Sequence, residues 1–351
     1  MKIGILGSGQ LGKMLIEAGR RIGLSPTDFR TFVSFEDKTA LLSFAQGLDA
    51  ATYELENFPL ECASILAQMT PCFFPAPSAL EIAQDRLFQK EHLKRLGIPT
   101  APFEAVEELK AALQKTGYPA LLKSRRMGYD GKGQFLFKDE SQLRDFSPPS
   151  VPTLLEGFIP FQRELSIIAA RAKSGDSVFY PLVENRHRQG ILRTTLAPAP
   201  GLSPALQNEA EKIARMILES LNYAGVLCVE FFQVGDKLIV NEFATRVHNS
   251  GHWTIEGAET SQFENHLRAG LGLPLGSGRA LGPTAMINLI SRLPDTKSIK
   301  EIETRPDTFL HLYGKSPAPN RKLGHLTLRA ATEQELQRRV AALSAIGYEI
   351  A

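Results

Sequence analysis

Two glutamates, Glu230 and Glu242, stand at equal distances on either side of Asp236 in the segment GVLCVEFFQVGDKLIVNEF. The segment reads as two strands joined by a tight turn, because Gly-Asp is a turn signal between apolar runs. An odd-length loop centred on Asp236 would make the two carboxylates face each other, with Cβ atoms about 4.5–5.5 Å apart. An even-length loop would place them on opposite faces of the sheet, where they could not act together.

A facing pair of carboxylates indicates a cation site. Two like charges about 5 Å apart repel by roughly 3 kcal/mol at an effective dielectric near 20. Apolar neighbours, among them Val229, Phe231 and Phe243, limit the solvation of the pair. A shared proton or bound divalent cations would relieve the repulsion. Oxygen ligands without cysteine or clustered histidine favour magnesium over zinc, so Glu230 and Glu242 predict a magnesium site.

The polar segment ATRVHNSGHW follows this pair directly. Its histidines, His248 and His252, are spaced four apart as in a zinc-binding helix. Gly251 disfavours a helix there, and Asn249 stands where such sites use a glutamate. We therefore expect Arg246, His248 and Asn249 to form a polar loop beside the metal, with donors for a small oxyanion.

Three features upstream indicate a nucleotide site. Lys123 lies in the apolar segment YPALLKSRR, where a cation is costly unless it faces a cleft that holds an anion. The loop GYDGKGQ at 128–134 is rich in glycine and can wrap phosphate oxygens with its amides. The strand LLEGF offers backbone groups to an adenine, and Glu164 on the next strand could accept from ribose hydroxyls. A solvent-facing lysine and an ordinary hairpin tip are the alternatives. The loop is no Walker A motif, since the only Gly-Lys-Ser, at 314–316, has Phe309 in place of the first glycine.

Near the N-terminus, Gly7, Gly9 and Gly12 spell G-x-G-x-x-G after a short apolar strand. A dinucleotide site also needs an acid at the end of the second strand, and Glu36 and Asp37 are close to that place. The segment in between is short and polar for a helix and a strand. The turn therefore serves a dinucleotide, another phosphorylated ligand, or packing alone.

These residues need elements that position them. The first hundred residues alternate strand and helix signals, which is typical of a parallel α/β sheet. Expected strands are Ile3–Leu6, Ala50–Tyr53, YPALLKSRR, VPTLLEGF, RELSIIAAR and RKLGHLTLRA; expected helices are Leu11–Ile22, Leu60–Gln68, Glu107–Thr116 and one long helix from Ser78, its N-cap, to Leu96.

Composition bounds the class of protein. A hydrophobic content of 43% supports a sizeable core, and 40 basic against 38 acidic residues give no field that would attract nucleic acid or an anionic membrane. The three cysteines are scattered, as free thiols in a reducing compartment are. The sequence shows no secretory signal and no apolar run of about 20 residues, so we expect a cytoplasmic protein.

Long stretches of the chain resemble the ATP-grasp enzymes, and more narrowly the 5-(carboxyamino)imidazole ribonucleotide synthase family, the ATPase subunit of purine biosynthesis. The resemblance covers nearly the whole chain. It runs through GSGQLGKM, TYELENFP, IAQDRLFQK, KSRRMGYDGKGQ, LLEGFIPFQRELS, YPLVENRHRQGILRTT, GVLCVEFF, VNEFATRVHNSGHWTIEGAETSQFENHLRA, MINLI and HLYGKSPAPNRKLGHLTL. The Gly-rich loop is shared with many ATP-grasp proteins, whereas the last long blocks are specific to this family.

The resemblance implies an ATP-grasp fold of mixed α/β and α+β class. Its parts would be an N-terminal parallel α/β domain on the ribonucleotide side over 1–98, similar to a Rossmann or biotin-carboxylase N-terminal domain; a small lid subdomain over 99–182; and a C-terminal subdomain over 183–351 with the metal site and a loop for the substrate phosphate.

The family's site residues transfer onto matching positions. For ATP these are Arg86, Lys123, Gly128, Tyr129, Asp130, Gly131, Lys132, Gly133, Gln134, Glu156, Gly157, Phe158, Ile159, Glu164, His187, Asn241 and Glu242. The metal ligands are Glu230 and Glu242. The residues for bicarbonate and carboxyphosphate are Arg246, His248, Asn249 and Lys315. The substrate contacts are Gln10, Tyr129, Asp130, Lys315, Arg321 and Lys322.

The implied reaction is the ATP- and bicarbonate-dependent carboxylation of 5-aminoimidazole ribonucleotide through carboxyphosphate. The implied cofactors are ATP and two magnesium ions, with manganese as a substitute, and the implied partners are a second copy of the chain and the mutase that uses the product. One departure is Thr245, where the family usually has proline. Alternatives are a formate-using or biotin-using ATP-grasp relative, a non-catalytic nucleotide-binding protein and a nicotinamide-dependent reductase.

Overall fold

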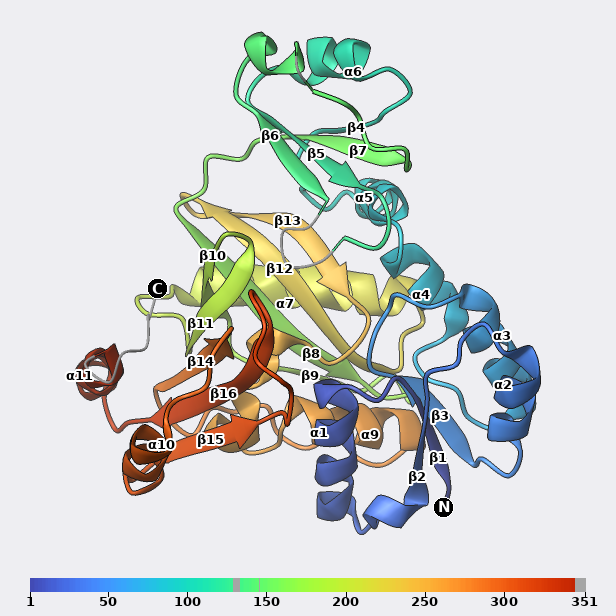
Figure 1. Ribbon diagram of the computed structural model, residues 1–351, viewed down its shortest axis with the longest axis vertical. Helices are drawn as coiled ribbons and strands as arrows, with labels where there is room; N and C mark the ends of the chain where they lie inside the picture. The colour runs from blue at the N-terminus through green and yellow to red at the C-terminus, as the bar shows by residue number, and fades with distance from the viewer. Residues whose placement is uncertain (129–132, 145, 345–351) are drawn as a thin grey trace.

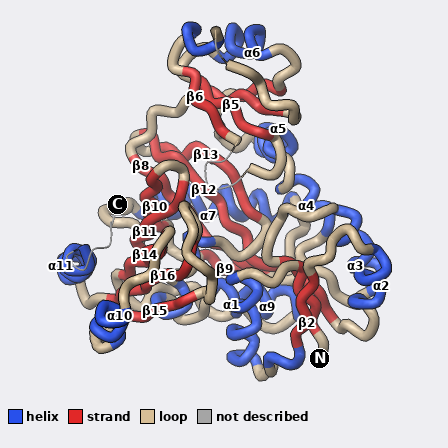
Figure 2. The backbone as a smooth tube through the Cα atoms, viewed as in Figure 1, coloured by secondary structure: helices blue, strands red, loops and turns tan. Residues whose placement is uncertain are grey.

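The computed structural model describes residues 1–128, 133–144 and 146–344. Three sheets organise these residues (Figures 1 and 2). A three-stranded sheet belongs to the N-terminal part, a four-stranded sheet stands at the top of the view, and a nine-stranded sheet runs through the body below it. No helix in the described ranges is long and apolar enough to cross a membrane.

The N-terminal sheet is parallel, with strand order β2-β1-β3. Strands β1 and β3 are buried along their whole length, as expected for a parallel sheet, whereas Arg30 and Thr31 of the edge strand β2 are exposed. The elements are β1 Ile3–Leu6, α1 Gln10–Gly19, β2 Phe29–Phe32, α2 Lys38–Ala45, β3 Ala50–Tyr53 and α3 Leu60–Met69.

Two helices, α4 Pro77–Ala83 and α5 Arg86–Arg95, lead from this sheet toward the small sheet. The single helix expected from Ser78 to Leu96 is wrong. The helix is interrupted at Asp85. The Asp85 side chain caps α5 by accepting from Leu87 N, and it also pairs with Arg125. An aspartate with extended backbone ends one helix and starts another, because its carboxylate satisfies an amide that the helix leaves free.

The small sheet is antiparallel, with strand order β4-β7-β5-β6, and helix α6 packs on it. Its elements are β4 Phe103–Ala105, α6 Leu109–Thr116, β5 Ala120–Ser124, β6 Gln134–Phe137 and β7 Thr153–Gly157.

The large sheet has strand order β13-β12-β8-β10-β11-β14-β16-β15, with β9 paired to β8. Its elements are β8 Arg163–Arg171, β9 Ser177–Phe179, β10 Val183–Arg188, β11 Ile191–Ala197, α7 Pro204–Ser220, β12 Gly225–Val234, β13 Lys237–Ala244, α8 Thr254–Gly257, α9 Gln262–Leu271, β14 Thr284–Ile290, α10 Thr296–Glu303, β15 Thr308–Leu312, β16 Lys322–Arg329 and α11 Glu333–Ser344. The range 99–182 thus spans the small sheet and also β8 and β9 of the large one.

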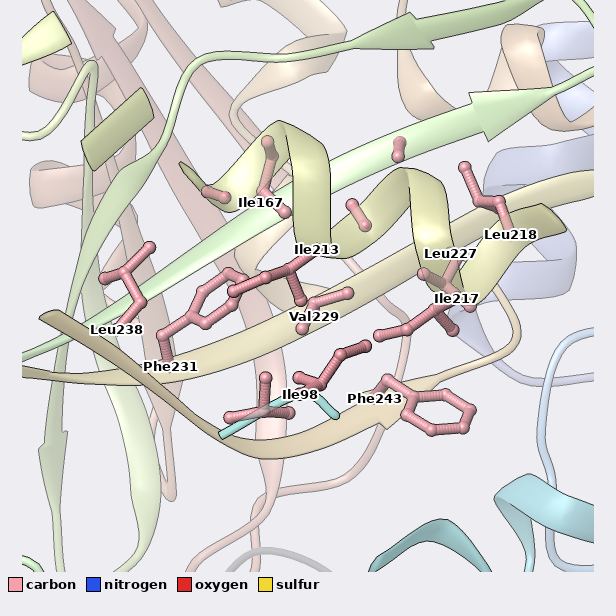
Figure 3. Close-up of a cluster of buried hydrophobic side chains, with 14 of the residues drawn as sticks. Ile98, Ile167, Ile213, Ile217, Leu218, Leu227, Val229, Phe231, Leu238 and Phe243 are labelled. Carbon is pink, nitrogen blue, oxygen red and sulfur yellow. The ribbon is translucent and has the colours of Figure 1, made fainter. Parts of the chain in front are cut away.

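A buried apolar cluster fixes one face of the large sheet. Helix α7 turns Ile213 and Ile217 toward Leu227, Val229 and Phe231 of β12 (Figure 3), and all five are at most 2% exposed. Because residues i and i+2 of a strand share a face, these apolar positions leave Glu230 on the opposite face of β12. The packing of α7 therefore sets which way that carboxylate points.

Most expected elements are present with small shifts at their ends. The strands expected at Ile3–Leu6 and Ala50–Tyr53 are β1 and β3, and the helix expected at Leu11–Ile22 is α1 followed by a short 3-10 helix at Arg20–Ile22. The strand β2 was not expected, because the segment 20–37 is polar, and the helix α2 that follows this segment was not expected either. Asp37 instead serves as the N-cap of α2, accepting from Ala40 N.

Candidate active site

One cavity of about 1160 Å³ is lined by strands of the small and the large sheet and, on the N-terminal side, by the start of α1 and the segment after β3. It gathers nearly every described residue that the sequence placed in a site, from segments far apart in the chain. Those lining it are Gln10, Arg86, Lys123, Gly128, Gln134, Glu156, Gly157, Phe158, Ile159, Glu164, His187, Glu230, Asn241, Glu242, Arg246, His248, Asn249, Lys315, Arg321 and Lys322. Gly133 is described but does not line the cavity, and Tyr129, Asp130, Gly131 and Lys132 lie outside the described residues.

The two glutamates face each other, although not for the expected reason. Val234 pairs with Lys237, so the turn has two residues and the odd-length loop is wrong. A regular ladder from that turn would pair Glu230 with Asn241. Instead the register shifts between Glu230 and Phe231, which pairs Glu230 with Glu242. This β-bulge leaves Asn241 as the extra residue and brings the carboxylates together.

Cationic neighbours stabilise both carboxylates. His248 Nε2 lies 3.1 Å from Glu230 Oε1, and an Arg86 guanidinium nitrogen lies 3.7 Å from Glu242 Oε2. Although burial opposes ionisation, the hydrogen bond and charge of His248 lower the pKa of Glu230 to about 2. Two facing carboxylates beside the amide of Asn241 suit magnesium, which binds through one or two carboxylates together with substrate phosphates. The described residues hold no group of three or more His, Cys, Asp or Glu side chains that would form a metal cage by themselves.

A buried charge cluster lies behind this pair. Lys123 Nζ is 3.0 Å from Glu156 Oε2, and Lys90 Nζ is 3.5 Å from the same oxygen. All three side chains are at most 6% exposed. Burial raises the pKa of Glu156, but Lys123 and Lys90 outweigh it and the net shift is downward. Lys123 thus faces the cavity from a strand, as its apolar setting predicted, while its charge is shared with a carboxylate.

A second acid–histidine pair lies on the wall formed by β8 and β10. Glu164 Oε2 is 2.6 Å from His187 Nδ1. Burial opposes protonation of this ring, but the bond to Glu164 raises the pKa of His187 overall. Phe158 is 45% exposed on the rim nearby, and Phe161 stacks on Phe232 with ring centroids 4.6 Å apart. This wall combines an apolar edge with a carboxylate, which suits a nucleoside.

The polar loop after β13 is fixed by a carboxylate from the N-terminal part. Glu56 Oε1 accepts from Thr245 N at 2.7 Å, and Glu56 Oε2 lies 3.3 Å from Arg246 Nε. Proline at position 245 could not donate this hydrogen bond. Both polar side-chain atoms of Asn249 are buried without a hydrogen-bond partner among the described residues. Such atoms are rare in a native interior unless they meet a ligand or water.

Sequence reasoning missed Glu54, which fills the anion position at the start of α1. Its carboxylate accepts from the amides of Gly9 and Gly12, and the side chain is only 4% exposed. A Cβ on Gly7, whose φ is +116°, would lie 2.3 Å from Glu54 Cγ. A helix N-terminus attracts anions, and here the protein's own carboxylate takes that place. Of the alternatives open for the glycine turn, the dinucleotide site is therefore excluded. The sequence did contain a signal for this contact, because Glu54 comes directly after the expected strand Ala50–Tyr53, which pairs with β1.

A basic segment, KSPAPNRK at 315–322, forms one end of the cavity. Lys315 Nζ donates to Gln10 Oε1, which joins the segment before β16 to the start of α1. Lys13 Nζ donates to Tyr313 O at 3.4 Å, and Arg321 donates to Ser316 O at 3.2 Å. Several cations therefore lie beside the start of α1 at one end of the cavity, as a phosphate site requires.

Three family models match the chain in succession. They are the ribonucleotide synthetase preATP-grasp domain over residues 27–84, the ATP-grasp domain over 91–263, and the phosphoribosylaminoimidazole carboxylase C-terminal domain over 284–339. The N5-carboxyaminoimidazole ribonucleotide synthase of Pseudomonas aeruginosa is 44% identical over 364 aligned residues, which cover 99% of each chain. This chain belongs to the N5-carboxyaminoimidazole ribonucleotide synthase family.

Solved structures of this family share the architecture. The Thermus thermophilus N5-carboxyaminoimidazole ribonucleotide synthetase superposes with a TM-score of 0.91 at 49% identity, covering 98% of each chain. The Aspergillus clavatus N5-carboxyaminoimidazole synthase, in complex with ADP and 5-aminoimidazole ribonucleotide, superposes with a TM-score of 0.90 at 30% identity over 98% of each chain. The expected family and ATP-grasp fold class are thereby confirmed.

Proposed function

We propose that this chain is an ATP-grasp ligase of purine biosynthesis that carboxylates 5-aminoimidazole ribonucleotide with bicarbonate and ATP. Membership of the N5-carboxyaminoimidazole ribonucleotide synthase family supports the reaction. The observation that places the reaction on these residues is that an acid pair, a buried lysine and a basic segment line one and the same cavity. ADP and the ribonucleotide, the two ligands of the Aspergillus clavatus complex, are the classes of molecule that such a cavity suits.

We assign the nucleotide to the side of the cavity between the small and large sheets. Lys123 and Arg86 meet the phosphates, the segment from Glu156 to Ile159 borders the adenine, and Glu164 accepts from the ribose hydroxyls. His187 holds Glu164 in place through their 2.6 Å contact. The loop 128–134 belongs to this assignment through its glycines, which permit close approach of backbone amides to phosphate oxygens.

We assign magnesium to Glu230 and Glu242, with Asn241 beside them. When bound, the ions would offset the charge that collects when bicarbonate meets the triphosphate. Two observations support this assignment: the two carboxylates face each other, and His248 lowers the pKa of Glu230 to about 2, which keeps that group anionic at neutral pH. Manganese, which also prefers oxygen ligands, would substitute.

We assign the chemistry to the loop after β13. A bicarbonate oxygen attacks the γ-phosphorus and ADP leaves, which gives carboxyphosphate; the ribonucleotide amine then attacks its carbon, releasing phosphate and a proton. Arg246, Asn249, Lys315 and His248, which is cationic beside Glu230, would orient the anions. The unpaired polar atoms of Asn249 support a ligand contact there. Because carboxyphosphate reacts readily with water, a closed cavity favours transfer to the amine.

We assign the ribonucleotide phosphate to the basic segment, with Lys315, Arg321, Lys322 and Gln10 in contact with it. Tyr129 and Asp130, which lie outside the described residues, would approach its imidazole.

We further propose that the protein is a cytoplasmic homodimer and that it passes its unstable product to a mutase. The chain would divide into an N-terminal part over 1–98, a lid over 99–182 and a C-terminal part over 183–351.

The test is phosphate release from ATP with each substrate omitted in turn. Full activity requires ATP, magnesium, bicarbonate and 5-aminoimidazole ribonucleotide together, and carbon from labelled bicarbonate appears in the product. Replacing bicarbonate by formate abolishes turnover. Turnover with formate would identify a different ATP-grasp ligase, and nucleotide binding without any turnover would identify a non-catalytic protein.

A further inference from the structure

Lys90 is a buried cation next to the cavity but not part of its lining. It lies in α5 and is 2% exposed. Its Nζ donates to Thr100 Oγ1 at 2.7 Å and to Asn241 O at 2.8 Å, and lies 3.5 Å from Glu156 Oε2. A buried ammonium is costly unless it is paired and hydrogen-bonded, and Lys90 is both. Because it cannot reach a ligand in the cavity, it acts through these neighbours.

The first neighbour is the bulge that pairs the two glutamates. Lys90 holds the carbonyl of Asn241, the extra residue of the bulge. Its sequence neighbour Gln89 holds the other side, since its side chain accepts from Phe243 N and donates to Phe243 O, both at 3.0 Å. Helix α5 therefore fixes the β13 backbone immediately before and after Glu242. A strand held at both positions cannot lose the bulge without breaking these bonds.

The second neighbour is the carboxylate that shares the charge of Lys123. Glu156 lies between two lysines, with Lys123 3.0 Å away and Lys90 3.5 Å away. The three groups together carry one net positive charge, whereas Lys123 and Glu156 alone would be neutral. Coulombic attraction in a partly dry site falls slowly with distance, so a phosphate in the cavity responds to this net charge.

We propose that Lys90 is a positioning residue for the metal–nucleotide site, holding the bulge that turns Glu242 toward Glu230 and leaving Lys123 with a net charge for phosphate. This inference rests on the proposed function, because it assumes a nucleotide at Lys123 and magnesium at the glutamates. It adds a residue that lies behind the site and touches none of the reactants.

The experiment measures ADP binding by calorimetry, without and with magnesium, in the full-length protein. Lys90→Met keeps the length of the side chain and removes its charge; we expect about tenfold weaker ADP binding without magnesium, as loss of one nearby charge implies. The increase in ADP affinity that magnesium produces falls below about twofold in this variant, because the bulge is no longer held. Lys94→Met, at an exposed position of the same helix, binds ADP as the wild type does.

A second variant separates charge from geometry. Lys90→Arg keeps the cation beside Glu156 but cannot reproduce the contact with the Asn241 carbonyl, so ADP binding without magnesium stays within about threefold of the wild type while the magnesium gain falls. Wild-type affinities in Lys90→Met, or a tenfold loss without magnesium in Lys90→Arg, would overturn the proposal; the second result decides the matter even if Lys90→Met does not fold. Failure of the wild type to bind ADP would instead overturn the proposed function.

Discussion

His266 is fully buried, and in the neutral form of its ring both nitrogens make hydrogen bonds. His266 Nδ1 accepts from Val226 N at 3.1 Å, and Nε2 lies 2.8 Å from Thr52 Oγ1, to which it donates. These bonds connect helix α9 with the large sheet and with β3 of the N-terminal sheet. Protonation would put a second donor against the Val226 amide. Burial lowers the pKa of His266 to about 3.

This shift makes the free energy of unfolding depend on pH with a defined sign. Above the unfolded pKa, about 6.5, the ring is neutral in both states and contributes no pH dependence. Below it the unfolded chain binds a proton that the folded protein excludes, so stability falls progressively as the pH drops toward 3. Between pH 7.5 and pH 5.0 this one side chain removes about 2 kcal/mol, since roughly 1.5 pH units at 1.36 kcal/mol each lie below the unfolded pKa.

Urea unfolding of the wild type and of His266→Gln, each at pH 7.5 and pH 5.0, measures the effect. The variant is less stable at pH 7.5 by about 1–3 kcal/mol, because a buried hydrogen bond is lost. At pH 5.0 the difference between the two proteins narrows by about 2 kcal/mol, because the variant has no ring to protonate. Thr52→Val keeps the ring and so keeps the full pH dependence. A difference between wild type and His266→Gln that is the same at both pH values would refute the reasoning.

Two further changes test the positions of the N-terminal acids. Glu54→Gln loses one of the two amide contacts with Gly9 and Gly12, so urea unfolding shows a loss of about 2–4 kcal/mol, whereas the exposed control Glu17→Gln changes little; equal effects of the two would contradict the role given to Glu54. Thr245→Pro removes the amide that Glu56 accepts and loosens Arg246, so steady-state kinetics show a KM for bicarbonate raised about fivefold with the KM for ATP unchanged. Thr245→Val keeps that amide and has the smaller effect; a larger effect for valine would point to the hydroxyl instead.

The sequence predicts side-chain chemistry better than it predicts backbone geometry. Glu230, Glu242, Lys123 and Glu164 stand out because a charged residue type in an apolar strand is costly unless a partner offsets its charge, and the residue type can be read from the sequence. The bulge at Asn241 is invisible, because nothing in the residue types of VNEF marks an extra residue. The correct pairing of the glutamates therefore came from an incorrect turn.

Residues that act through distant partners were also out of reach. Glu54 follows a strand like many surface acids, and only the parallel pairing of β3 with β1 brings it under the amides of Gly9 and Gly12. Lys90 was expected only as part of one long helix. The sequence did not indicate which face of that helix would pack against β13, so the contacts of Lys90 could not be predicted. Asp85 showed the same limitation, since its capping of α5 depends on the backbone break that it helps to make.

The most direct test of the account is manganese binding, followed by electron paramagnetic resonance in the presence of ADP. Wild-type protein is predicted to bind Mn²⁺ in an ADP-dependent manner, and the double variant Glu230→Gln/Glu242→Gln to leave it free in solution while still folding. Equal Mn²⁺ binding by both proteins would contradict the claim that the two carboxylates brought together by the bulge hold the metal.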